Sequence, residues 1–235
     1  MNVIQPVDAA DPTALLTRIR QAALPAGALD TEEVGLRQQG EMRFTPNGRW
    51  LPFTAEQRFF GPGVEFRWQA RVAIAPLVKA QVVDAFENGR GCLRARLCGV
   101  LPIARAAGPA TDLGEALRGL AELPWRPWAL RPSPWLHWEA VAEGRLRAEY
   151  RDGKTQAAIE FEVAADGQVL GAFTPGRPRI VGQAVVPTPW SGVFRDYRRL
   201  DRVLVPTFAE AVWHLPEGPF PYWRGRVLEY RLGRS

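Results

Sequence analysis

The 235-residue chain is 46% hydrophobic and 23% charged, a balance that is typical of a globular protein and excludes a largely disordered one. Its net charge of +5 would suit an anionic partner, but the basic residues are dispersed among acidic ones and, apart from Lys79 and Lys154, are all arginines. We therefore assign the charge to the solvated surface and expect no nucleic-acid partner.

Two cysteines, Cys92 and Cys98, fall on one predicted strand. On a straight strand their Cα atoms would lie about 20 Å apart at ~3.3 Å per residue, beyond the ~7 Å that a disulfide allows, so free thiols in a reducing compartment are predicted. The first residues lack the basic start and apolar core of a signal peptide, and no run approaches the ~18 apolar residues of a membrane span. We expect a cytoplasmic protein with no membrane span.

The first predicted element is a short amphipathic helix over residues 12–23. Asp11 fits its N-cap and Pro12 its first helical position. Its apolar residues recur at helical spacing and form one stripe, made of Leu15, Leu16, Ile19 and Ala23. Residues 1–30 are expected to form a tail and this helix.

From residue 34 the hydrophobic pattern changes to a period of two, which is typical of strands with one buried face. The clearest alternation runs from Val64 to Ile74. Turn residues such as Asn88-Gly89 separate the apolar runs. The pattern predicts a meander of strands over residues 34–44, 50–60, 64–74, 78–86 and 91–100.

A second helix is predicted in the middle of this strand-rich chain, at about residues 112–123. Asp112 and Glu115 fit a capping box, and Pro124 ends the helical pattern. One face carries an apolar stripe of Leu113, Ala116, Leu117 and Leu120. The flank beside it carries Glu115, Arg118 and Glu122. A row of tryptophans separated by prolines follows, namely Trp125, Trp128, Trp135 and Trp138.

The strand pattern resumes after the tryptophan row, with Asp-Gly turns at residues 152–153 and 166–167. Residues 175–189, rich in proline and glycine, are predicted to be a looser connection. The predicted strands of this half cover residues 138–142, 145–151, 155–163, 168–173, 192–200, 203–215 and 220–232.

Together these elements predict a mostly β (α+β) fold. The regular turn spacing favours a single curved antiparallel sheet or half-barrel of about 10–12 strands. The N-terminal helix and the central helix are expected to pack on or cap the concave face, because a helix with one apolar stripe must bury it. Residues 31–235 are predicted to form one β-rich domain.

The central helix and its tryptophans suit two arrangements. In one they fill the interior of the sheet, and in the other they leave an apolar cavity with a few polar groups, as ligand pockets do. Arg105 is expected to flank the helix and pair with Glu122. The predicted ligand-binding residues are Phe66, Trp68, Arg105, Trp125, Trp128, Trp135 and Trp138.

The sequence offers only weak signals for catalysis. The two histidines are far apart and there is no C-x-x-C, so we expect no metal; there is also no phosphate-binding loop, and we expect no cofactor. No G-x-S-x-G elbow is present, which argues against serine hydrolysis. Acids on apolar strands and a histidine among aromatics remain as acid–base candidates, namely Glu56, Asp84, Glu122 and His137. Each also suits a purely structural role, as a solvent-facing, ion-paired or packed side chain.

Several motifs together resemble an uncharacterised bacterial family, a domain of unknown function of about this length. They include W-L-P-F-T-A-E-Q at 50–57, V-D-A-F-E-N-G-R-G at 83–91, L-A-E-L-P-W-R-P at 120–127, P-T-P-W at 187–190 and W-H-L-P-E-G-P-F at 213–220. The resemblance implies no catalytic residues. The layout of strands, helix and strands also looks like the half-barrel of the periplasmic lipoprotein carrier and related lipid-binding proteins, a likeness of architecture only.

These observations leave three hypotheses. The first is binding of a hydrophobic small molecule or acyl chain in a tryptophan-lined cavity. The second is an enzyme that uses the same cavity. The third is a structural or interaction protein whose tryptophans fill the core.

Overall fold

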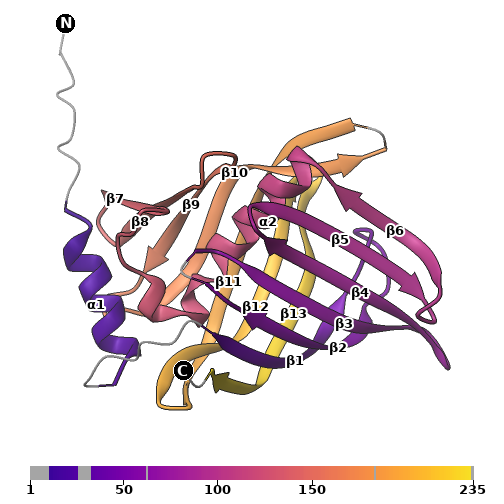
Figure 1. Cartoon of the computed structure of the whole chain (residues 1–235), viewed down its shortest axis with the longest axis horizontal. Coiled ribbons are helices and arrows are strands. Elements are labelled where there is room, and N and C mark those ends of the chain that lie inside the picture. The colour runs from indigo at the N-terminus through magenta and orange to yellow at the C-terminus, as the bar shows by residue number, and fades with distance from the viewer. Residues whose placement is uncertain (1–10, 26–32, 62, 183, 234–235) are drawn as a thin grey trace, which may run out of the picture.

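The computed structural model describes residues 11–25, 33–61, 63–182 and 184–233. These ranges contain two α-helices, two short 3₁₀ helices and one sheet of thirteen strands (Figure 1). The helices are α1 (Thr13–Ala23), α2 (Pro109–Ala121), η1 (Leu123–Trp125) and η2 (Pro127–Ala129). The strands are β1 (Val34–Met42), β2 (Leu51–Phe59), β3 (Phe66–Ala75), β4 (Val78–Glu87), β5 (Arg90–Leu97), β6 (Leu101–Ala107), β7 (Leu136–Ala142), β8 (Arg145–Arg151), β9 (Gln156–Val163), β10 (Val169–Val181), β11 (Ala184–Leu200), β12 (Val203–Leu215) and β13 (Gly218–Leu232).

The sheet confirms the predicted mostly β fold and its single antiparallel sheet. Each strand pairs with its neighbours in the chain, except that β6 and β7 do not pair with each other, and β1 also pairs with β13, where Val34 lies opposite Leu232. The free edges are therefore β6 and β7, the strands on either side of α2 in the sequence. In Figure 1, α2 lies between the two ends of the sheet, and it contacts β4, β5 and β6 from one end and β8, β9 and β10 from the other.

The prediction of about 10–12 strands is low because it omits β6. β6 was not predicted because all its side chains except Ala106 are exposed, so its sequence has no alternation to detect. Residues 175–189 were predicted to be a looser connection, and this is wrong, because they lie largely within β10 and β11. Their prolines are tolerated because this hairpin extends past its neighbours: β9 pairs with β10 only as far as Phe173, and β12 pairs with β11 only from Trp190 (Figure 1).

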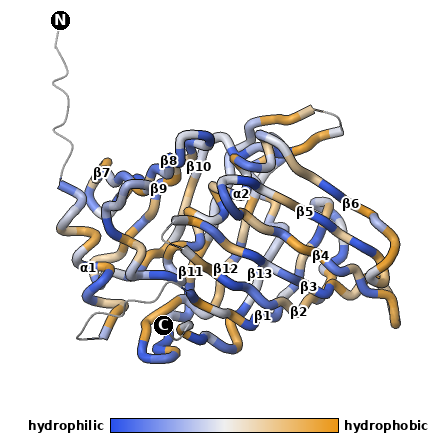
Figure 2. The backbone as a smooth tube through the Cα atoms, in the orientation of Figure 1, coloured by the Kyte–Doolittle hydropathy of each residue, from blue (hydrophilic) through white to orange (hydrophobic). Residues whose placement is uncertain are grey.

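Alternation of hydrophobic and polar residues fixes which face of each strand is buried, as the changing colour along the strands in Figure 2 shows. In β2 every second side chain is buried, from Leu51 to Phe59. Two of the inward-facing positions are polar, since Gln38 of β1 and Gln57 of β2 are each 1% exposed. Trp68 of β3 donates a hydrogen bond from Nε1 to Gln38 at 2.9 Å. These glutamines bring polar groups to an otherwise apolar interior.

α1 confirms the predicted stripe. Leu15, Leu16, Ile19 and Ala23 are buried, and the helix contacts β12 and η2. Pro12 is its N-cap rather than its first helical residue, and the Asp11 carboxylate accepts from the Thr13 N–H at 2.9 Å. None of the helices in the described ranges has the length and apolar character needed to cross a membrane.

α2 begins three residues earlier than predicted, with Gly108 as its N-cap, so the predicted capping box is wrong. Asp112 lies inside the helix, and its carboxylate accepts a hydrogen bond from the Gly91 N–H of β5 at 2.7 Å. The helix therefore fastens to the sheet at β5 rather than capping itself. Cys92 and Cys98 are both free, as predicted.

Candidate functional site

A cavity of about 340 Å³, partly open to solvent, lies between α2 and the strands facing it. Its lining is mainly apolar and rich in aromatic side chains, and one end carries buried charged groups. The volume falls in the range of small-molecule sites. The aromatic lining residues are Trp68, Trp125, Trp190, Phe194, Trp213, Tyr222 and Trp223.

The aromatic lining is held in place by contacts behind it. Trp213 stacks on Tyr222 with ring centroids 5.8 Å apart, and Trp223 stacks on Phe53 at 5.6 Å. The Trp125 indole donates to the Pro206 carbonyl at 2.8 Å. Rings fixed in this way present a rigid apolar surface, which a ligand can contact at low entropic cost.

α2 carries two buried glycines with opposite surroundings. A Cβ at Gly119 would lie 2.1 Å from the Val64 carbonyl oxygen, so the close approach of this helix turn requires glycine. A Cβ at Gly114 would meet no atom within 4 Å, and Gly114 lines the cavity. Glycine inside a helix costs about 0.5–1 kcal/mol relative to alanine. Packing thus accounts for Gly119, whereas Gly114 keeps space open.

Arg118 of α2 is the centre of the buried charges in the cavity. Its guanidinium donates to Asp84 of β4 and, at 2.9 Å, to Glu122 one helix turn away. Gln57 donates to the other oxygen of Glu122. Burial opposes the charge, but the carboxylates of Glu122, Asp84 and Glu115 raise the pKa of Arg118, so this side chain stays cationic.

Glu115 and Asp84 form an acidic pair beside this arginine. Both are less than a tenth exposed, and Glu115 Oε2 and Asp84 Oδ1 have no hydrogen-bond partner in the described part of the chain. Burial and then the charge of Asp84 raise the pKa of Glu115 well above its ordinary value of 4.5. Burial likewise raises the pKa of Glu122, against the effect of Arg118. The raised pKa favours the neutral form of Glu115, which lies next to the ion-paired carboxylate of Asp84.

Arg177 of β10 approaches the cavity from the opposite wall. Its side chain is 8% exposed and lies over Trp190 and Trp213, with 4.9 and 5.6 Å from the guanidinium carbon to the ring centroids. It donates to the Tyr222 hydroxyl at 3.4 Å, and Trp190 Nε1 donates to the same oxygen at 3.1 Å. β10 has a register shift between Thr174 and Arg177, which sets the orientation of this side chain.

The structure brings together four of the residues predicted for a site. Trp68, Asp84, Trp125 and Glu122 all line the cavity. Phe66 lies just behind it, with its ring 4.6 Å from the Arg118 guanidinium carbon.

The rest of the predicted tryptophan row lies outside the cavity lining. After α2 the chain turns through η1 and η2, which place Trp128 in the filled core. Trp135 is 40% exposed. Trp138 stacks on Phe161 of β9 and donates to the Arg131 carbonyl at 2.9 Å. The prolines that space these rings turn them away from the helix.

Three other predicted residues face solvent. Glu56 of β2, Arg105 of β6 and His137 of β7 are exposed, and the lining of the cavity does not include them. The predicted pairing of Arg105 with Glu122 is wrong, because Glu122 pairs with Arg118 of its own helix. Glu56 occupies the outward position of a strand whose alternate residues are buried, which explains its orientation.

Sequence reasoning missed Glu115, Arg118 and Arg177 as site residues, together with the tryptophans of the last strands. The helical spacing of Glu115, Arg118 and Glu122 was a signal, since it puts all three on one flank of α2. Trp190 and Trp213 stand in the P-T-P-W and W-H-L-P-E-G-P-F motifs. Arg177 had no signal, because it falls in the stretch predicted to be irregular.

A second hollow of about 530 Å³ is larger but more open. Its lining includes exposed side chains such as Thr54, Arg71 and Lys79, so it lies on the solvated face of the sheet. Within the described ranges no three His, Cys, Asp or Glu side chains are grouped as metal ligands. The less open cavity beside α2 is therefore the candidate site.

Comparison with known proteins places the chain among uncharacterised relatives. The model of a family of unknown function, DUF6920, matches residues 14–231. None of the curated proteins that were compared matches the chain.

Solved structures share its fold at very low identity. A putative outer membrane lipoprotein-sorting protein domain from Vibrio parahaemolyticus has a TM-score of 0.50 at 8% identity, covering 94% of this chain and 92% of the other. A DUF1329 family protein from Desulfovibrio piger has a TM-score of 0.49 at 12% identity, covering 94% and 92%. A LolA superfamily protein from Nitrosomonas europaea also has 0.49, at 11% identity, covering 97% and 96%. The resemblance to lipoprotein-carrier half-barrels is thus confirmed as one of fold.

Proposed function

The chain belongs to DUF6920, a family of unknown function, and from this premise we propose that it binds the apolar part of a small molecule, such as an acyl chain, in the cavity beside α2. The cavity is large enough for such a ligand and is walled by fixed aromatic rings. Its few polar groups are gathered rather than scattered, which suits a ligand with one polar end.

Gly114 carries this proposal. A larger residue at position 114 would have a higher helix propensity than glycine and would fill the empty space beside it. The position nevertheless holds a glycine, and no atom lies within 4 Å of where a Cβ would be. A core selected for stability alone would fill that space. The opening is therefore best explained by an occupant that enters it.

We also propose that α2 lies on the concave face of the sheet as a lid. The sheet is unpaired between β6 and β7, and α2 contacts strands from both ends of it. A ligand held under such a helix would enter or leave by a movement of α2 relative to the strands.

Binding of a neutral fluorescent probe, N-phenyl-1-naphthylamine, tests the function. The wild-type protein should bind the probe, and Gly114→Leu should weaken binding at least tenfold by filling the cavity. Gly114→Ala is the matched control, because it makes a similar gain in helix propensity while occupying little space. Equal binding by the wild type and Gly114→Leu would exclude this cavity. Native mass spectrometry of the purified protein would then identify a co-purifying molecule.

Acid–base catalysis in the same cavity is a second candidate, favoured by the buried Asp84–Glu115 pair. A protonated acid beside a carboxylate is an arrangement that enzymes use to move protons. Incubation with a panel of acyl esters tests it. Turnover that Glu115→Gln abolishes while probe binding persists would support catalysis, and an inactive wild type would count against it for these esters.

A further inference from the structure

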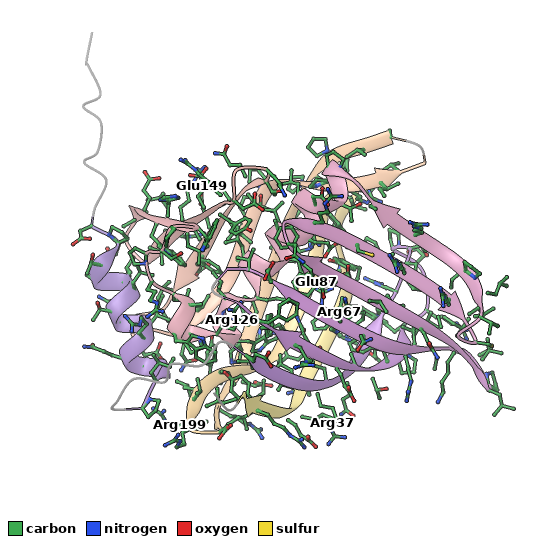
Figure 3. The ribbon with its side chains drawn as sticks, viewed as in Figure 1. Arg37, Arg67, Glu87, Arg126, Glu149 and Arg199 are labelled. Atoms are coloured by element: carbon green, nitrogen blue, oxygen red, sulfur yellow. The ribbon has the colours of Figure 1, made fainter. Side chains whose placement is uncertain are left out.

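Among the described residues, Arg126 and Arg177 are buried and the Arg118 side chain is only 15% exposed, and protein groups compensate two of these three arginines. Arg118 pairs with the carboxylates of Asp84 and Glu122. Arg126, which lies within the outline of the fold in Figure 3, donates to the Gly63 and Gly61 carbonyls at 2.9 and 2.5 Å. These two side chains serve to hold the structure together.

Arg177 differs from both. In the part of the chain that the structure describes it has no carboxylate within 4.0 Å, and its one hydrogen bond is the 3.4 Å contact to the Tyr222 hydroxyl. The faces of Trp190 and Trp213 provide the rest of its surroundings. A buried cation is costly unless it is paired, and ring faces offset only part of that cost.

The acidic groups across the cavity do not supply the missing counter-charge. Asp84 and Glu122 are already bonded to Arg118. Glu115 is the remaining acid: burial and the charge of Asp84 raise its pKa, and the opposing effects of Arg177 and Arg118 do not cancel this, so the neutral form is favoured. Among the described residues the Arg177 guanidinium therefore has no carboxylate paired with it.

The position of Arg177 also suits a ligand that enters from outside. It stands at the base of the hairpin formed by the ends of β10 and β11, which extends past the neighbouring strands (Figure 1). Arg179 lies two residues along the same strand, lines the cavity and is half-buried. Two cations on one face of one strand therefore follow the cavity wall towards the exposed hairpin.

We infer that Arg177, with the Tyr222 hydroxyl, binds the anionic headgroup of the ligand, so that the bound molecule is an amphiphile with a carboxylate or phosphate at one end and its chain among the tryptophans. The inference rests on the proposed function, since it names the polar end of the same ligand. A guanidinium can donate two parallel hydrogen bonds to either group, and these exceed the strength of bonds between neutral groups.

Displacement of the neutral probe by amphiphiles that share a twelve-carbon chain tests the headgroup. Dodecanoate or dodecyl phosphate should bind the wild type at least tenfold more tightly than dodecan-1-ol and dodecylamine, below their micellar concentrations. The better of the two anions identifies the headgroup as carboxylate or phosphate. If the alcohol binds as tightly as both anions, the headgroup inference is wrong although the cavity still binds chains. If dodecylamine binds most tightly, Asp84 and Glu115 hold the headgroup instead.

Substitution of Arg177 separates its charge from its shape. Arg177→Gln should weaken the preferred anion about tenfold or more and change the alcohol far less, which removes the preference. Arg177→Lys should keep part of it, since the ammonium is still a cation but lacks the planar fork. An unchanged preference in Arg177→Gln would overturn the assignment. Failure of the wild type to bind either the probe or any dodecyl compound would instead contradict the proposed function itself.

Discussion

α2 has a packed face and an open face, and the surroundings of the two contain the same kinds of residue. On the packed face, Gly119 allows close contact with the Val64 carbonyl, and Trp128 beyond the helix lies in the core. On the open face, Gly114 borders empty space, and Trp190 lines the cavity. The residue type alone does not show whether a glycine or tryptophan is packed in the core or lines the cavity. This depends on the elements that lie opposite the residue in the fold.

The buried arginines repeat this contrast. Burial lowers the pKa of Arg126 to about 10, and two backbone carbonyls hold it outside the cavity. Arg177, which lines the cavity, has two rings and a hydroxyl. By comparison, Arg37 and Arg199 lie at the lower edge of the molecule in Figure 3, where water solvates them. Arg126 is therefore structural, whereas Arg177 is the residue for which we propose a ligand.

The largest expected difference is between two arginine variants. Arg118→Gln should lower the free energy of unfolding by about 3–5 kcal/mol, because it leaves the carboxylates of Asp84 and Glu122 buried without their cation. Arg177→Gln should change it by no more than about 1 kcal/mol, because relief of a buried charge offsets the lost ring contacts. Urea unfolding of the ligand-free proteins measures both. Equal losses would mean that Arg177 is as structural as Arg118.

The two glycines of α2 should respond to alanine with opposite signs. Gly119→Ala should destabilise by about 1–3 kcal/mol, because the new Cβ would overlap the Val64 carbonyl oxygen. Gly114→Ala should stabilise by about 0.5–1 kcal/mol, because nothing opposes the gain in helix propensity. Thermal unfolding of the two variants measures both changes in stability, and it compares the same substitution at two positions of one helix. A loss at Gly114 would show that its space is needed for packing.

Glu115 should make the stability of the cavity depend on pH. Its pKa is raised in the folded state, so its contribution is fully present below about pH 4.5, its ordinary pKa, and is lost as pH rises through the folded value. Glu115→Gln removes this dependence, so the variant should gain stability relative to the wild type as pH increases above 4.5. The raised pKa of Glu122 has the same sign but is present in both proteins. Parallel pH profiles of the melting temperature would contradict the assignment.

The smallest effect is expected for the exposed tryptophan of the row. Trp135→Ala should change the free energy of unfolding by less than about 0.5 kcal/mol and leave probe binding unchanged, because the ring is 40% exposed and outside the cavity lining. Trp190→Ala, which removes a lining ring, is its counterpart and should weaken probe binding. Similar binding losses in both variants would place the probe elsewhere.

The sequence was sufficient for the sheet where residues alternate. Phe66, Trp68 and Val72 are buried as the period of two predicts, and the Asn88-Gly89 turn has both residues at positive φ. It was insufficient where neighbouring strands are missing, since Pro175 and Pro187 fall in strands only because the extended hairpin leaves one side unpaired. The local amino-acid composition does not show whether a strand has a neighbour on one side or on both.

The candidate site was predicted in part. Trp68 and Asp84 were found on clear strand patterns, and Glu122 and Trp125 were found at the end of the predicted helix, whereas Glu115 and Arg118 were assigned only to its polar flank. Trp190, Trp213 and Arg177 lie on strands far along the chain, and their place opposite α2 depends on the order of strands in the sheet. No local period encodes that order.

The pairing of β1 with β13 also has a kinetic consequence. Val34 lies opposite Leu232, so the sheet becomes continuous only after nearly the whole described chain has been synthesised. Before β13 docks, β12 and β1 both present unpaired edges, and the wall that carries Trp190 and Arg177 is not joined to the one that carries Asp84. Contacts so distant in sequence form slowly, and open strand edges favour aggregation. During synthesis this protein should therefore depend on chaperones until its last strand emerges from the ribosome.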